Sequence, residues 1–269
     1  MSRFSTFYIG CFLILISVFS FLNIIYSYYF NIFLSVDSYT YTFFISLILG
    51  ICIIFFKYAK YKKINIFEKI ITVIFGYLFF PLIIALPYYF SIYNISFFDC
   101  YFESISGFTS TGFTVFDNIK HLDQSLILWR STSQWIGGIY FLFSIILLID
   151  VFDDNLKKSL TNFLSFNINE TIKQSFKIFI LYSVLTLILF IILNIIDIRT
   201  FDSLNLSMTI ISSGGFIPVN SIESILNTKF KEIIFSLLLL TSFFSLFLSY
   251  NLIFLKKKNL DFFTEDLYL

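Results

Sequence analysis

The sequence has 269 residues, of which 58% are hydrophobic and 13% are charged, and its formal net charge is +1 at pH 7. Soluble globular proteins carry about 25% charged residues, so the composition excludes an ordinary soluble domain. Since lipid cannot satisfy free backbone polar groups, such a chain must lie in a membrane mostly as helices.

Six apolar stretches are long enough to cross a bilayer, which requires about 20 apolar residues. In chain order they are 7–30, 41–57, 68–90, 125–150, 174–197 and 231–255. The first has no small-residue cleavage site and is too long for a signal peptide, so we expect the chain to retain it. The sequence therefore predicts an all-α integral membrane protein.

The basic residues predict the direction of these spans. Lys and Arg concentrate in cytoplasmic loops, and simple alternation of the spans puts 13 of the 18 basic residues on one side. They are Arg3, Lys57, Lys60, Lys62, Lys63, Lys69, Lys157, Lys158, Lys173, Lys177, Lys256, Lys257 and Lys258. Both termini are then expected to be cytoplasmic.

Two polar segments between spans share one spacing. Asp99 and Asp202 each follow a Phe and precede a glycine, Gly112 or Gly215, by 13 residues, so the copies are offset by 103 residues. The residues after each Asp are too few to cross the membrane and predict half-helices with Asp at the positive end. A non-helical loop at membrane depth must be enclosed by protein or line a wet cavity, and carbonyl rings can replace the hydration shell of K⁺. We therefore interpret both loops, on the outer side, as candidate ion-lining segments.

These residues resemble a known family. Residues 102–115 (FESISGFTSTGFTV) are similar to the first filter region of TrkH/KtrB-type potassium uptake proteins, and 133–138 (SQWIGG) to the helix after it. Residues 207–216 resemble the second filter, and 261–267 the cytoplasmic lead-in to a third repeat. Tyr140 departs from the family, which has a small residue there, and leaves the packing at this position open.

The resemblance implies four span, pore half-helix, filter loop and span repeats around one pore, preceded by two extra helices. Only two of the four repeats are represented here. The implied units are 1–63 (two N-terminal transmembrane helices), 64–155 (first repeat), 156–258 (second repeat) and 259–269 (cytoplasmic tail before a third repeat).

The resemblance also implies which residues contact the ion. Backbone carbonyls of the two loops would bind potassium, which is the substrate; we expect no covalently bound cofactor and no other metal site. These residues are Thr109, Ser110, Thr111, Gly112, Ser212, Ser213, Gly214 and Gly215. Glu103 would attract the ion or form a structural hydrogen bond, and Arg130 would brace the filter or extend to the membrane interface.

The implied function is potassium uptake across a bacterial inner membrane. Because two repeats cannot enclose an ion, we expect a homodimer or a second polypeptide supplying repeats three and four. The family further implies a cytoplasmic TrkA-type nucleotide-binding regulatory subunit, with membrane lipid around the helices and no nucleic acid. The alternative is a truncated remnant or a non-conducting assembly subunit. No nucleophile–base pair or Walker-type loop predicts an enzyme.

Overall fold

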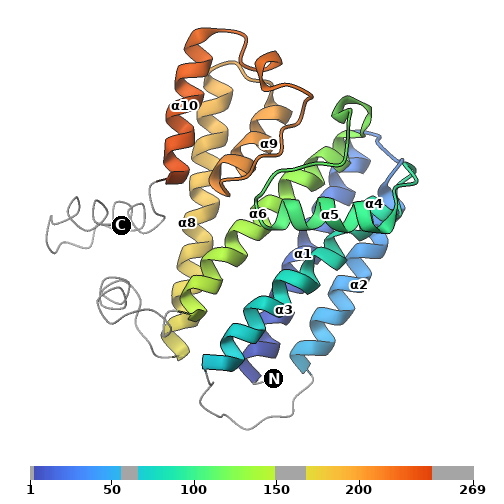
Figure 1. The fold of residues 1–269 in the computed structure, drawn as a ribbon, viewed down its shortest axis with the longest axis vertical. Coiled ribbons are helices and arrows are strands. Elements are labelled where there is room, and N and C mark those ends of the chain that lie inside the picture. Colours follow the sequence, from blue (N-terminus) through green and yellow to red (C-terminus); the bar gives the residue numbers. More distant parts are fainter. Residues whose placement is uncertain (1–2, 56–65, 149–167, 244–269) are drawn as a thin grey trace, which may run out of the picture.

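The computed structural model describes residues 3–55, 66–148 and 168–243 (Figure 1). Several sequence predictions lie outside these ranges. They concern Lys57, Lys60, Lys62, Lys63, Lys157, Lys158, Lys256, Lys257, Lys258 and the tail 259–269.

Every regular element within these ranges is a helix, which confirms the all-α prediction. The helices are α1 (Arg3–Tyr29), α2 (Val36–Phe55), α3 (Ile66–Ile84), α4 (Leu86–Tyr89), α5 (Phe97–Phe108), α6 (Gln124–Leu148), α8 (Ile168–Ile195), α9 (Thr200–Ile211) and α10 (Lys229–Phe243). By length and composition, four segments can cross a membrane: Thr6–Tyr29, Val36–Phe55, Ile66–Tyr89 and Ser175–Ile195. The chain is thus a multi-pass membrane protein.

The other two expected spans differ from these four. α6 is 25 residues long, but it carries Arg130, Gln134 and several hydroxyl side chains in its first half, which lower its apolar character. α10 is described for 15 residues only.

The third span is interrupted near its end. α3 stops at Ile84, and the single turn α4 begins at Leu86 with a proline in its first turn. Pro87 has no N–H to continue the helical hydrogen bonds, so the chain breaks there. Pro81, by contrast, lies inside α3.

The long helices run lengthwise through the molecule, whereas α5 and α9 are short (Figure 1). The start of α3, the end of α2 and the start of α8 lie at the lower end in this view. The carboxyl ends of α5 and α9 lie near mid-height, and the loops that follow them run back toward the upper end. Both candidate loops therefore begin near the middle of the length of the helical assembly.

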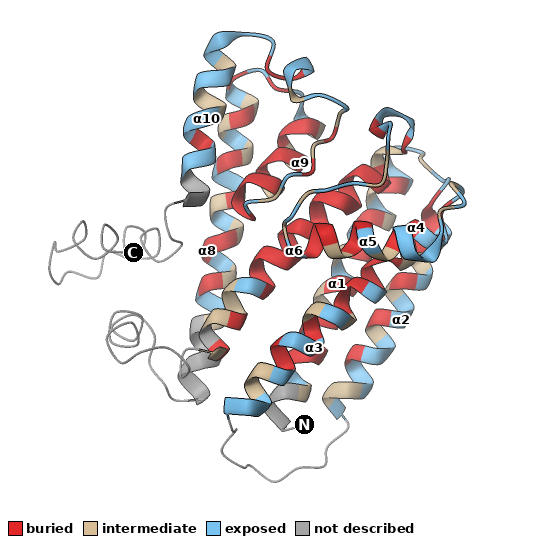
Figure 2. Ribbon diagram, in the orientation of Figure 1, coloured by how far each residue is buried: buried red, intermediate tan, exposed pale blue. Residues whose placement is uncertain are grey.

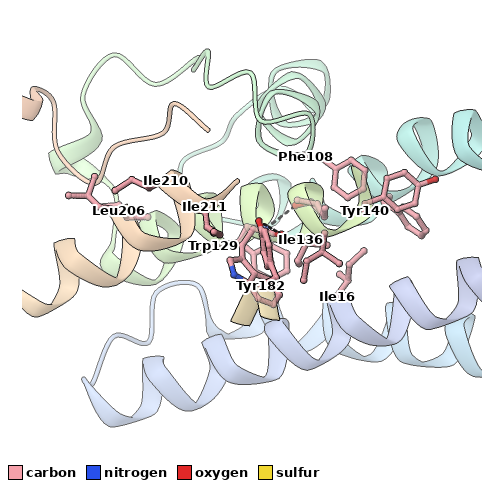
Figure 3. Close-up of a cluster of buried hydrophobic side chains, with 14 of the residues drawn as sticks. Ile16, Phe108, Trp129, Ile136, Tyr140, Tyr182, Leu206, Ile210 and Ile211 are labelled. Carbon is pink, nitrogen blue, oxygen red and sulfur yellow. Dashed lines mark hydrogen bonds between the residues drawn. The ribbon is translucent and has the colours of Figure 1, made fainter. Parts of the chain in front are cut away.

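α6 forms the centre of the core, and most of its length is buried in Figure 2. Trp129 of α6 donates from Nε1 to the carbonyl of Ile84 at 3.0 Å, and Trp135 donates to Thr186 Oγ1 at 2.9 Å. Figure 3 shows α6 side chains packed with residues of α1, α5, α8 and α9. Because α6 contacts all these helices, it fixes their relative positions.

The packing around Tyr140 is close, although this residue is large. Its hydroxyl donates to the carbonyl of Val73 at 2.9 Å, and its ring lies 5.2 Å from those of Phe80 and Phe108. A Cβ built on Gly76 would overlap the Tyr140 hydroxyl. The missing side chain of Gly76 therefore makes the room that Tyr140 occupies.

Candidate ion-binding loops

α5 begins with a side-chain cap. The Ser96 hydroxyl accepts a hydrogen bond from the Asp99 backbone N–H at 3.2 Å and donates to Asp99 Oδ2 at 2.6 Å. The cap satisfies one of the free N–H groups at the helix start. Asp99 thus lies in the first turn of α5, and Asp202 lies in the first turn of α9, as the sequence predicts.

α5 ends in a Schellman motif. Ser110 has φ +57°, its N–H donates to the carbonyl of Gly107 at 2.9 Å, and the N–H of Thr111 donates to the carbonyl of Ser106 at 2.9 Å. This pair of bonds stops a helix and turns the chain sharply. A serine in this left-handed conformation is uncommon, because Cβ crowds the backbone.

α9 ends in the same way, exactly one offset of 103 residues later in the chain. Ser213 has φ +55°, its N–H donates to Ile210 O at 3.0 Å, and Gly214 N–H donates to Thr209 O at 2.8 Å. The two helices and loops therefore share backbone geometry as well as residue spacing.

In each copy, a hydrogen bond from a side-chain hydroxyl in the short helix to a backbone carbonyl after the loop, called here the hydroxyl tie, closes the loop. Ser106 Oγ donates to the carbonyl of Phe113 at 2.5 Å, and Thr209 Oγ1 donates to the carbonyl of Phe216 at 3.1 Å. Both bonds join positions seven residues apart. Each tie holds the residues after the glycine against the last turn of its own helix.

The carbonyls of the eight predicted filter residues are available to a ligand. Among the described residues, none of these oxygens accepts a hydrogen bond. Thr109, Thr111, Ser213 and Gly215 are exposed, whereas Ser212 is buried. A row of free carbonyls in a membrane protein needs water, an ion or another protein surface.

The loops meet at their two glycines. Gly112 has φ +82°, and a Cβ built there would overlap the backbone of Gly215. A Cβ built on Gly215 would lie 3.2 Å from the Cα of Gly112. Direct contact between these backbones leaves no ion-sized opening between the two positions.

Glu103 holds the residues that follow the first loop. Its Oε1 accepts from Arg130 Nε at 2.7 Å and from Thr114 Oγ1 at 3.0 Å, and its Oε2 accepts from the Val115 N–H at 2.9 Å. Glu103 is 0% exposed and Arg130 1% exposed. Of the alternatives that the sequence left open, this geometry favours a structural hydrogen bond for Glu103 and a bracing role for Arg130.

Arg130 also contacts the second loop. Its Cζ lies 4.2 Å from the centroid of the Phe216 ring, and its Nη1 donates to the carbonyl of Ile217 at 3.5 Å. A guanidinium over an aromatic face is attracted by the ring quadrupole. One side chain of α6 therefore connects the first loop, through Glu103, with the second.

The second loop has no counterpart of Glu103. One offset of 103 residues from Glu103 and Val115 leads to Leu206 and Pro218. Proline has no N–H to donate, so the second loop does not need the acceptor that the first one has. Aligning the two copies in the sequence is enough to show that Leu206 replaces Glu103 and Pro218 replaces Val115.

Two further contacts were not predicted from the sequence. Asn220 Oδ1 accepts from the N–H of Ile119 at 2.8 Å, and its Nδ2 donates to Asn118 Oδ1 at 2.8 Å, which joins the segments after the two loops. Gln134, buried on α6, contacts the second loop. Gln134 lies in the segment 133–138 (SQWIGG) that resembles the known family, which marks it as a residue of interest. The spacing of residues does not show which of the two loops its side chain contacts.

Two other titratable residues, Tyr93 and His121, contact each other outside the two candidate loops. His121 is exposed in the loop before α6, and its carbonyl accepts from the Tyr93 hydroxyl at 3.1 Å. Burial, and next the Asp123 charge, raise the pKa of Tyr93. Within the described ranges, no three His, Cys, Asp or Glu residues group to hold a metal ion.

Comparison with known proteins shows what the chain is similar to. No family model matches the chain. An uncharacterized cation transporter of Methanocaldococcus jannaschii is 30% identical over 167 residues, which are 58% of this chain and 34% of that protein. The Trk system potassium uptake protein TrkG of Escherichia coli is 32% identical over 104 residues, 37% of this chain and 21% of that protein.

The fold is similar to that in the crystal structure of the potassium transporter TrkH from Vibrio parahaemolyticus. The TM-score is 0.78 at 22% identity, and the match covers 94% of this chain and 52% of that one. The chain thus spans about half the length of the TrkH chain and matches about a third or less of the two sequence relatives. It is a multi-pass membrane protein. Its fold is TrkH-like and its sequence is similar to a Trk potassium uptake protein, which confirms the resemblance noted in the sequence.

Proposed function

We propose that the chain supplies two walls of a pore through which potassium enters the cell. The carbonyls of 109–112 and 212–215 would replace water around the ion. The observation that carries this proposal is the matched pair of loops, whose eight carbonyls accept no hydrogen bond from the described residues. The names of the sequence relatives, a cation transporter and a potassium uptake protein, support the choice of ion.

The proposed units are those expected from the sequence: helices in 1–63, a first repeat in 64–155, a second in 156–258 and a tail in 259–269. The order α3, α5, loop, α6, followed by α8, α9, loop, α10, supports two such repeats. We place both termini in the cytoplasm of a bacterial cell, with both loops facing outward. Lys69 lies near the start of α3, at the opposite end of the molecule from the outer parts of the loops, which supports this direction.

A complete pore needs further walls. The contact between Gly112 and Gly215 closes the space between the two loops, so an ion would pass along their exposed side. A second polypeptide with two more repeats, or a second copy of this chain, would enclose that side. A TrkA-type regulatory subunit on the cytoplasmic side is a further prediction.

Uptake of potassium by cells that lack their own potassium uptake tests the proposal. The chain is expressed alone and together with a polypeptide that supplies two further repeats. We expect uptake in at least one case, its loss in Gly215→Val, whose side chain would crowd the Gly112 backbone, and no change in the exposed-loop control Ser221→Val. Absence of uptake in both cases, with insertion in the membrane verified, would contradict it.

One observation favours the alternative of a non-conducting subunit or remnant. The backbones of Gly112 and Gly215 contact each other directly, so there is no room for an ion between them. On this alternative, Gly215→Val changes no potassium phenotype in a strain whose uptake depends on the assembly.

A further inference from the structure

Gln134 contacts two N–H groups of the second loop and one hydroxyl in the last turn of α9. In the amide orientation that satisfies both ends of the side chain, its oxygen accepts from the N–H groups of Gly215 at 3.0 Å and Phe216 at 3.2 Å. Its nitrogen donates to Thr209 Oγ1 at 3.1 Å, and that hydroxyl donates to the carbonyl of Phe216. Gln134 is fully buried, so no water competes for these bonds.

The loop lies directly on this amide. A Cβ built on Gly214 would overlap the side-chain amide of Gln134. Glycine at this position therefore allows the approach that the three hydrogen bonds require.

Among the residues that the structure describes, the first loop has no contact equivalent to that of Gln134 with the second loop. One offset of 103 residues after Gln134 lies Leu237 of α10, an apolar residue that is 59% exposed. In the first loop the Phe113 N–H donates no hydrogen bond to any described residue. The Gln134 position of α6 thus supports the second loop, and its counterpart on α10 offers no such amide to a loop.

Holding these N–H groups also sets the direction of two carbonyls. A trans peptide is planar, and its C=O points opposite to its N–H. The Gly215 N–H shares a peptide with the Gly214 carbonyl, and the Phe216 N–H shares one with the Gly215 carbonyl. Because Gln134 accepts from both N–H groups, the carbonyls of Gly214 and Gly215 must point away from α6.

We propose that Gln134 is a positioning residue that orients the Gly214 and Gly215 carbonyls and thereby sets the preference of the path for potassium over sodium. The choice of ion rests on the proposed function. The contact of Gln134 with the second loop can be tested without measuring transport. Failure of this proposal can therefore be distinguished from failure of the proposed function.

Hydrogen exchange on the purified full chain in detergent tests the contact. Gln134→Met removes both ends of the amide at similar volume, and we expect the amides of Gly215 and Phe216 to exchange about tenfold faster or more. Gln134→Glu keeps the accepting oxygens and should keep the protection. Thr132→Val is the matched control, because the Thr132 hydroxyl is buried on α6 and donates only to Leu128 of its own helix.

Unchanged exchange in Gln134→Met would overturn the contact. If the amides of residues 125–140 also lose protection from exchange in Gln134→Met, the substitution has unfolded α6. The exchange of Gln134→Glu then decides whether the contact exists. Loss of protection at Gly215 and Phe216 in Gln134→Glu, with α6 still protected, would also overturn it.

Transport tests the ion preference. In cells where the wild type shows uptake, we expect Gln134→Met to reduce potassium-over-sodium discrimination, read as the ratio of the two KM values, by about tenfold. Gln134→Glu should restore the ratio, and Thr132→Val should match the wild type. An unchanged ratio despite faster exchange overturns the role in ion preference. A wild type without uptake contradicts the proposed function, while the exchange data still decide the contact.

Discussion

At the scale of single residues, the buried pair of Glu103 and Arg130 joins the two loops. Glu103 accepts from Arg130 and from two groups that follow the first loop, and Arg130 covers Phe216 of the second. Charges removed from water are costly unless they are paired and hydrogen-bonded. The pair is therefore stable only while both loops keep their positions.

Glu103→Ala should destabilise the protein by about 3–5 kcal/mol, because Arg130 keeps a buried charge without its partner. Thermal unfolding in detergent measures this. Glu223→Ala, in the exposed segment after the second loop, is the control and should change stability by about 0.5 kcal/mol or less. Equal melting of the two variants would show that the buried pair contributes little.

At the scale of helices, α6 positions both loops. Gly137 of α6 lies so close to the end of α5 that a Cβ there would overlap the Phe108 carbonyl, and Gln134 contacts the second loop. Tyr140, about one turn beyond Gly137, packs into the space left by Gly76 of α3. α6 therefore places α3, α5 and the second loop relative to one another.

Gly76→Ala should cost about 1–3 kcal/mol, since its methyl group would overlap the Tyr140 ring and hydroxyl. The added cost should shrink in a Tyr140→Leu background, where the ring is gone. A double-mutant cycle by thermal unfolding gives the coupling. Additive effects of the two changes would contradict the packing described for this pair.

Structure that depends on residues close together in the chain could be predicted from the sequence. The repeated spacing predicted both short helices and both loops, and its offset of 103 residues aligns Ser110 with Ser213. The contacts between distant segments could not be predicted, because no local rule states that Gln134 meets the second loop or that Gly76 receives Tyr140. The sequence also left two roles open for Glu103, and only the neighbours of its carboxylate favour one.

At the scale of the whole molecule, the outer parts of the loops after α5 and α9 lie at the opposite end of the helical assembly from the start of α3 (Figure 1). With the lysine pattern, this arrangement gives the chain a proposed direction in the membrane. The exposed segment around Ser221 would face outward, and Glu68, exposed in the first turn of α3, would face the cytoplasm.

Cysteine labelling tests that direction. In a background where Cys11, Cys52 and Cys100 are replaced by serine, Ser221→Cys should react with a membrane-impermeant maleimide added to intact cells. Glu68→Cys should react only after permeabilisation. The reverse pattern would invert the proposed topology, and labelling of both from outside would contradict the alternation of spans.

The central claim is that the paired glycine loops carry potassium. Flux of radioactive rubidium into proteoliposomes measures this most directly. The chain is reconstituted together with the polypeptide that supplies the other two repeats. We expect flux that excess potassium suppresses and that Gly215→Val abolishes, while Ser221→Val leaves it intact. Equal flux in Gly215→Val and the wild type would contradict the claim.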